Sequence, residues 1–112
     1  MTVAAPSEDA VARELWSSFV SLLRAYTSAH GLNGPRQAIL EVSADSVLVR
    51  AGERQLLVTR QGNQGSWQRE QGQPIDFTLG DDGRITANGE AGELKTEEMD
   101  IVAERLAREI MR

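Results

Sequence analysis

The sequence contains no cysteine and a single histidine, His30, among its 112 residues. Without thiols the chain has no disulfide framework, no cysteine nucleophile and no zinc site that needs sulfur ligands. The lack of cysteine suits a reducing compartment, so we expect a cytoplasmic protein. No apolar run reaches the roughly 18 residues of a membrane helix, and residues 1–6 lack the basic start and apolar stretch of a signal peptide. We therefore expect no membrane partner.

Positive charge is also scarce. The formal net charge is -5, and Lys95 is the only lysine among the 12 basic residues. An acidic chain is poorly suited to phosphate backbones, so we expect no nucleic-acid partner. The length fits one domain that buries roughly two thirds of its unfolded surface on folding. We predict a flexible N-terminus over residues 1–6 and a single domain over residues 7–112.

No residue pattern in the sequence predicts a catalytic, cofactor or metal site. His30 has no nucleophile or orienting carboxylate in a local motif, which favours a packing or capping role. Ser66 lacks the second glycine of a nucleophile elbow. The acidic turn at residues 80–83 imitates the centre of a calcium loop, but Gly80 and Gly89 occupy positions that require side-chain oxygens. We therefore expect no enzyme activity, no cofactor and no metal, and we interpret this turn as a hairpin.

Residues 7–29 predict a first amphipathic helix. Ser7 is a suitable N-cap, and Glu8 and Asp9 lie at the positive end of the helix dipole. Gly31 can supply the left-handed residue that ends a helix. The apolar side spans about half of the circumference, wider than the roughly 100° stripe that packs on one neighbour. We therefore expect a second element, in addition to one sheet face, to pack on this helix.

The hydrophobic period changes to two from residue 38 onward, which predicts an antiparallel meander of five to six strands separated by tight turns. The fourth strand has the weakest signal, because only Trp67 interrupts a polar run over residues 63–73. That composition favours an edge strand or a hairpin tip. The predicted strands cover residues 38–43, 47–51, 55–61, 66–71, 75–79 and 84–87.

Alternation assigns the apolar strand residues to two faces. On the opposite face from the predicted core, Ile39, Leu48 and Leu57 stand one per strand on three consecutive strands, which predicts a small apolar patch on the back of the sheet. The inward set that we expect the helices to cover comprises Leu40, Val42, Val47, Val49, Leu56, Val58, Ile75, Phe77, Leu79 and Ile85.

Residues 96–111 predict a second amphipathic helix, with Thr96 as its N-cap and Glu97 in its first turn. Residues 88–93, rich in glycine and glutamate, connect the last predicted strand to this helix. Ile101 falls outside the apolar stripe of this helix. With both helices packed on one face of the meander, the predicted fold class is α+β.

Trp67 and Arg69 share one face of the polar segment. An aromatic residue in such a place is a partner anchor, half of a cation–π pair or a lid over the core edge. Together with the wide first helix and the apolar patch, it favours a non-catalytic protein-interaction module that forms a homodimer and can bind another protein. The candidate interaction surface comprises Ile39, Leu48, Leu57, Trp67, Arg69 and Ile101.

In its size, acidity and amphipathic ends the chain resembles bacterial secretion chaperones, although those proteins typically interrupt their strands with a helix that this sequence does not predict. The resemblance implies an adaptor or chaperone-like version of the interaction module. The alternative is a small apolar-ligand binding protein, in which the sheet and the first helix enclose an apolar cavity beside Trp16, Tyr26 or Trp67. An enzyme assembled from scattered carboxylates is a third interpretation.

Overall fold

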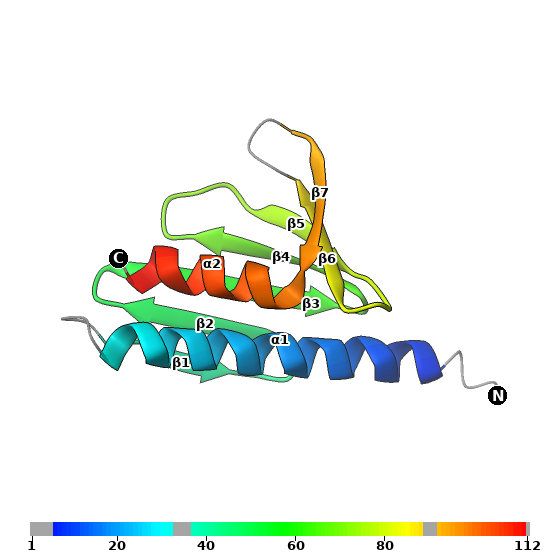
Figure 1. The fold of residues 1–112 in the computed structure, drawn as a ribbon, viewed down its shortest axis with the longest axis horizontal. Helices are drawn as coiled ribbons and strands as arrows, with labels where there is room; N and C mark the ends of the chain where they lie inside the picture. Colours follow the sequence, from blue (N-terminus) through cyan, green and yellow to red (C-terminus); the bar gives the residue numbers. More distant parts are fainter. Residues whose placement is uncertain (1–5, 33–36, 89–91, 112) are drawn as a thin grey trace.

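The computed structural model describes residues 6–32, 37–88 and 92–111. In chain order, one helix precedes a continuous run of strands and a second helix follows it. The strands form one antiparallel sheet in which each pairs with its neighbours in sequence (Figure 1). The predicted α+β meander is confirmed, but the described residues form seven strands rather than five to six. The elements are α1 (Pro6–Leu32), β1 (Ile39–Val42), β2 (Ser46–Ala51), β3 (Arg54–Gln61), β4 (Gln64–Arg69), β5 (Ile75–Leu79), β6 (Arg84–Asn88), β7 (Leu94–Glu98) and α2 (Met99–Met111).

Glycines in tight turns hold the meander in register. The β2–β3 turn leaves two residues between the paired Ala51 and Arg54. Gly52 (φ 64°) and Gly62 (φ 63°) open the β2–β3 and β3–β4 turns in the left-handed region, which glycine enters without a Cβ penalty. These short turns force neighbouring strands to pair as hairpins.

The two helices lie side by side on one face of the sheet and run in the same direction (Figure 1). The core lies between them and the sheet. The predicted inward residues face this core, although Leu40 and Ile75 are only partly buried and Val42 is exposed. The largest fully buried apolar side chains are Phe19, Leu23, Leu56, Leu79, Ile85, Val47, Val49, Val58 and Val102.

β4 lies inside the sheet, between β3 and β5, so the predicted edge or hairpin-tip position of this segment is wrong. Trp67 points to the helix face and stacks on Phe77, with ring centroids 5.1 Å apart. Gly65 pairs with Phe77, and a Cβ built on Gly65 would lie 2.5 Å from Phe77 Cζ. A single large ring beside a glycine therefore anchors a strand whose other side chains are polar.

β7 includes residues 96–98, which we expected to form the N-terminus of the second helix. Thr96 pairs with Thr86 of β6, and their hydroxyl oxygens lie 2.8 Å apart. The predicted N-cap at Thr96 is wrong, since α2 begins at Met99. Pairing with β6 gives this segment ladder hydrogen bonds, and a β-branched residue such as threonine suits a strand.

The limits of α1 also differ from the prediction. The helix continues to Leu32, so Gly31 lies inside it and does not end it. Pro6 is the first residue of α1, where a missing backbone N–H costs nothing. The remainder of the predicted flexible terminus, residues 1–5, lies outside the described residues.

Candidate interaction surface

The outer face of the sheet, opposite the helices, carries the predicted apolar patch. Leu48 of β2 and Leu57 of β3 lie directly opposite each other. Leu57 is 41% exposed and Leu48 is half-buried. Ile39, which is 62% exposed, lies diagonally beside Leu48 because Glu41 is the β1 residue opposite Leu48. The structure therefore brings these three predicted residues together on one face.

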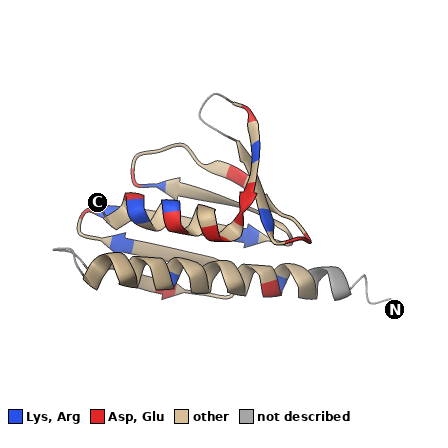
Figure 2. Ribbon diagram, viewed as in Figure 1, with Lys and Arg blue, Asp and Glu red and all other residues tan. Residues whose placement is uncertain are grey.

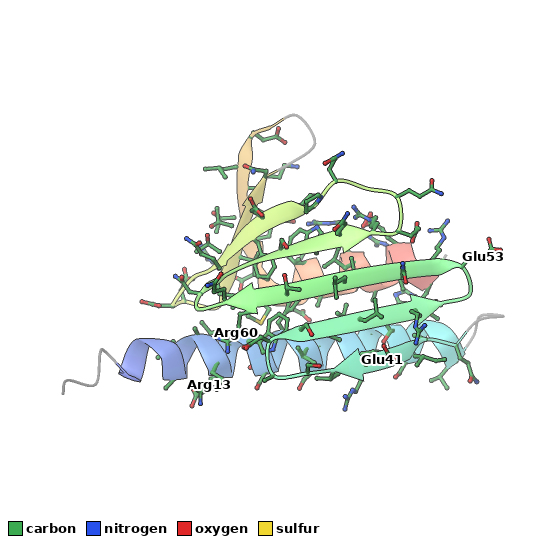
Figure 3. All side chains as sticks on the ribbon, turned by 180° about the vertical axis from the view of Figure 1, so that it is seen from behind. Arg13, Glu41, Glu53 and Arg60 are labelled. Atoms are coloured by element: carbon green, nitrogen blue, oxygen red, sulfur yellow. The ribbon has the colours of Figure 1, made fainter. Side chains whose placement is uncertain are left out.

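The only charged side chain of β1 is already paired. Arg50 of β2 donates a hydrogen bond to Glu41 over 2.7 Å, and Figure 3 shows Glu41 on the outermost strand. The other β1 residues, Ile39, Leu40 and Val42, are apolar. Apolar side chains therefore dominate this end of the sheet on both of its faces.

β1 also exposes a row of backbone groups. The N–H of Ser43 donates to the C=O of Ser46 over 2.8 Å, and hydrogen-bonded residues alternate along an antiparallel pair. Glu41 therefore bonds to β2, whereas Leu40 and Val42 direct their N–H and C=O groups away from the sheet. Among the described residues, no group pairs with this row. It is an open strand edge of the kind that templates further pairing.

We name this region the β1-end surface and define it by its apolar residues. Val42 is 45% exposed even though it lies on the helix side of the sheet. Sequence alternation placed Val42 in the core, but an outermost strand has a neighbour on one side only, which leaves the side chain in water. The members of the β1-end surface are Ile39, Leu40, Val42, Leu48 and Leu57.

The opposite edge of the sheet has a different composition. β7 carries three charged residues, Lys95, Glu97 and Glu98. Charged side chains on an edge strand discourage pairing with another chain. Figure 2 shows this concentration of charge on β7 and α2. One edge of the sheet is therefore protected, whereas the β1 edge is apolar.

Trp67 and Arg69 do not join the β1-end surface, and the predicted place of Trp67 on an exposed interaction surface is wrong. Trp67 is only 4% exposed and belongs to the core. Arg69 points to the same side and donates to both carboxylate oxygens of Glu109 in α2, with 3.0 Å to Oε2. The sequence shows the shared face of these residues correctly, but the helices that cover this face are distant in sequence.

Ile101 lies apart from the other candidates. It is 52% exposed on α2, and α2 covers the face of the sheet opposite Leu48 and Leu57 (Figures 1 and 3). Charged residues lie at helical spacing from it along α2, Glu104 three residues later and Arg108 seven residues later. Ile101 is therefore an isolated apolar side chain among charges.

Polar pairs join α1 to α2. Tyr26 donates a hydrogen bond to Asp100, and His30 Nε2 lies 3.1 Å from Glu104 Oε2. The hydrogen bond to Asp100 raises the pKa of Tyr26 above its usual value of 10.0, and burial adds to the rise. His30 therefore has a carboxylate partner that lies on another helix and that no local motif could show.

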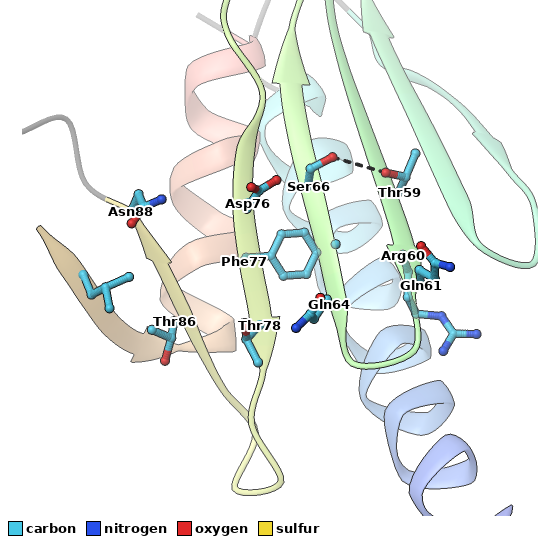
Figure 4. A pocket seen from close by; sticks show the side chains of 12 residues that line it. Thr59, Arg60, Gln61, Gln64, Ser66, Asp76, Phe77, Thr78, Thr86 and Asn88 are labelled. Carbon is cyan, nitrogen blue, oxygen red and sulfur yellow. Dashed lines mark hydrogen bonds between the residues drawn. The ribbon is translucent and has the colours of Figure 1, made fainter. Parts of the chain in front are cut away.

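A hollow of about 830 Å³ lies on the outer face of the sheet over β3 to β7 (Figure 4). Thr59 Oγ1 and Ser66 Oγ lie 3.3 Å apart across its lining. An apolar ligand needs an apolar cavity, so this hollow does not support the alternative of an apolar-ligand carrier. Its polar lining side chains include Thr59, Gln61, Gln64, Ser66, Asp76, Thr78, Thr86 and Asn88.

Within residues 6–32, 37–88 and 92–111, no three side chains from histidine, aspartate and glutamate gather as metal ligands. At the acidic turn, Asp82 Oδ1 accepts the backbone N–H of Arg84 over 3.1 Å, and Gly83 adopts φ 82°. These contacts are those of a hairpin turn. Neither α1 nor α2 contains a stretch long and apolar enough to cross a lipid bilayer.

Comparison of the chain with models of known families, with curated proteins and with solved structures finds no match. A functional conclusion must therefore come from the chemistry of the surface.

Proposed function

We propose that the protein is a non-catalytic interaction module that forms a homodimer through the β1-end surface. One observation carries the proposal: Ile39, Val42 and Leu57 expose apolar side chains at the end of the sheet whose strand edge is open. Apolar area costs roughly 25 cal/mol per Å² when left in water, and association removes that cost. Clustered exposure of this kind is typical of protein-binding surfaces.

The exposed side of α1 supports the proposal. Over residues 10–32 the charged side chains of this helix are Arg13, Glu14 and Arg24, apart from the half-buried His30. Figure 2 shows the contrast with the charges of α2. Few charges must be desolvated when a second molecule covers such a helix, and depletion of charge is typical of the centre of an interface.

An adaptor or chaperone-like role is the version of this function that we favour. A homodimer displays two copies of the outer sheet face, and each copy offers the polar hollow lined by Thr59 and Ser66. A second protein that binds this face would be held by two identical sites, which strengthens binding without any new contact.

The test is the solution mass of the full chain, measured by light scattering over a concentration series, with native mass spectrometry on the same sample. We expect twice the 12.3 kDa of one chain at high concentration, with no extra mass bound. A mass of one chain at every concentration would overturn the homodimer. A monomer that retains a small molecule would favour the apolar-ligand carrier instead.

A further inference from the structure

We propose that β1 of one copy pairs antiparallel with β1 of a second copy, so that two sheets join edge to edge into one. This inference rests on the proposed homodimer and names how it is built. The outward N–H and C=O groups of Leu40 and Val42 are the groups that such a pairing uses. A second copy supplies an identical open edge, as a two-fold interface requires.

The alternation of side chains restricts the register. If the helices of both copies lie on the same side of the joined sheet, residues that face each other across the seam must come from the same face. Pairing Leu40 with Leu40 of the second copy meets this condition. It also sets Ala38 opposite Val42, and Ile39 opposite Glu41, of the second copy. The half-buried Leu40 and Ala38 and the exposed Val42 then cover one another on the helix side.

The neighbouring registers are less favourable. A pairing centred on Glu41 sets two glutamates directly opposite each other, and like charges in that position are destabilising. A pairing centred on Ile39 places Val42 opposite a residue that precedes both Ala38 and β1 in the second copy, so Val42 is not covered by the paired strand. The register centred on Leu40 avoids both costs, and each Glu41 keeps its own Arg50.

The paired strands alone bury too little area for a stable dimer, so the helices must also take part in the interface. α1 has 27 residues and is therefore about 40 Å long. Figures 1 and 3 place it along the β1 end of the molecule. A helix side about 10 Å wide offers up to about 400 Å² per copy. Two such areas with the paired strands approach the about 1,000 Å² that a specific interface buries.

The cysteine-free chain allows a direct test. In the proposed register the Cα atoms of Leu40 and its counterpart are about 5.5 Å apart, within the range of about 4.4 to 6.8 Å that a disulfide spans. Leu40→Cys should therefore give a disulfide-linked dimer in most chains on mild oxidation, read by non-reducing electrophoresis. Glu41→Cys is the matched control, since its two copies are about 8 Å apart in this register.

Amide hydrogen exchange tests the pairing without substitution. The Leu40 and Val42 amides should be protected at concentrations where the dimer forms and should exchange freely after dilution. The Glu41 amide bonds to β2 and should stay protected in both conditions.

The outcomes separate the two proposals. A dimer by mass with efficient Leu40→Cys cross-linking and protected Leu40 and Val42 amides supports the edge pairing. A dimer by mass in which Leu40→Cys does not cross-link and these amides exchange freely overturns the edge pairing but leaves the homodimer. Preferential cross-linking of Glu41→Cys overturns the register. A monomer at every concentration overturns both proposals.

Discussion

Arg105 of α2 donates hydrogen bonds to both carboxylate oxygens of Glu97 in β7, over 2.8 and 2.9 Å. This bidentate pair ties the last strand to the helix that follows it. The hydrogen bonds from Arg105 hold the pKa of Glu97 below its ordinary value of 4.5, against the opposing effect of burial. The same pair raises the pKa of Arg105.

Glu97→Gln should lower the free energy of unfolding by about 0.5 to 1 kcal/mol at neutral pH, because the partly exposed pair loses its charge. A depressed folded-state pKa stabilises the fold above the unfolded pKa, and this stabilisation is lost as the pH falls through the folded pKa. The difference between the two proteins should therefore shrink below about pH 4.5. Urea unfolding over a pH series measures it. Glu93→Gln is the control. It removes the ion pair between Glu93 and Lys95, whose charged atoms lie 3.9 Å apart, and it should lower the free energy of unfolding by less.

Leu56→Ala and Leu57→Ala form a matched test of the two sheet faces. Leu56 is fully buried against the helices, so its truncation should cost about 2 to 5 kcal/mol of unfolding free energy. Leu57 lies on the outer face, so its truncation should cost less than about 1 kcal/mol. Denaturant unfolding at a protein concentration low enough to hold a single oligomeric state gives both values. Equal costs would contradict the assignment of the faces.

Gly65→Ala should destabilise the protein by about 1 to 3 kcal/mol through overpacking. The new Cβ would lie 2.3 Å from the Thr59 carbonyl oxygen and 2.5 Å from Phe77 Cζ. Gly72→Ala is the control, because its Cβ would lie 3.7 Å from Arg69 Cβ, an ordinary contact. We expect Gly72→Ala to change the melting temperature little. A stable Gly65→Ala protein would mean that Phe77 does not lie across β4.

Tyr26 offers a titration that is free of overlap, since it is the only tyrosine. Its phenolate should appear above the usual pKa of 10.0, because the hydrogen bond to Asp100 favours the neutral hydroxyl. Stability from this bond is present below the unfolded pKa and is lost as the pH rises through the folded pKa. Ultraviolet absorbance of Asp100→Asn should show the titration moved toward 10.0. An unchanged titration in this variant would contradict the contact.

Part of the candidate surface could be predicted from the sequence, and part could not. Alternation alone placed Ile39, Leu48 and Leu57 on one face, and the structure groups them there. The predicted meander makes the first strand an edge, but whether another segment covers that edge depends on tertiary packing, which the sequence does not show. Trp67 was a surface candidate because its neighbours in sequence are polar, but its neighbours in space are the rings of the core.

The sequence by itself determined the two helices, the antiparallel meander and the faces of the apolar residues on the predicted strands. These properties depend on turn glycines and on side-chain periods of two and 3.6, which act over a few residues. Only the tertiary structure decided that β4 is internal, that Thr96 belongs to a strand and that the β1 edge is left open. Each of these depends on pairing or packing between segments, and such contacts override local capping and polarity signals when they satisfy more backbone groups or bury a larger ring.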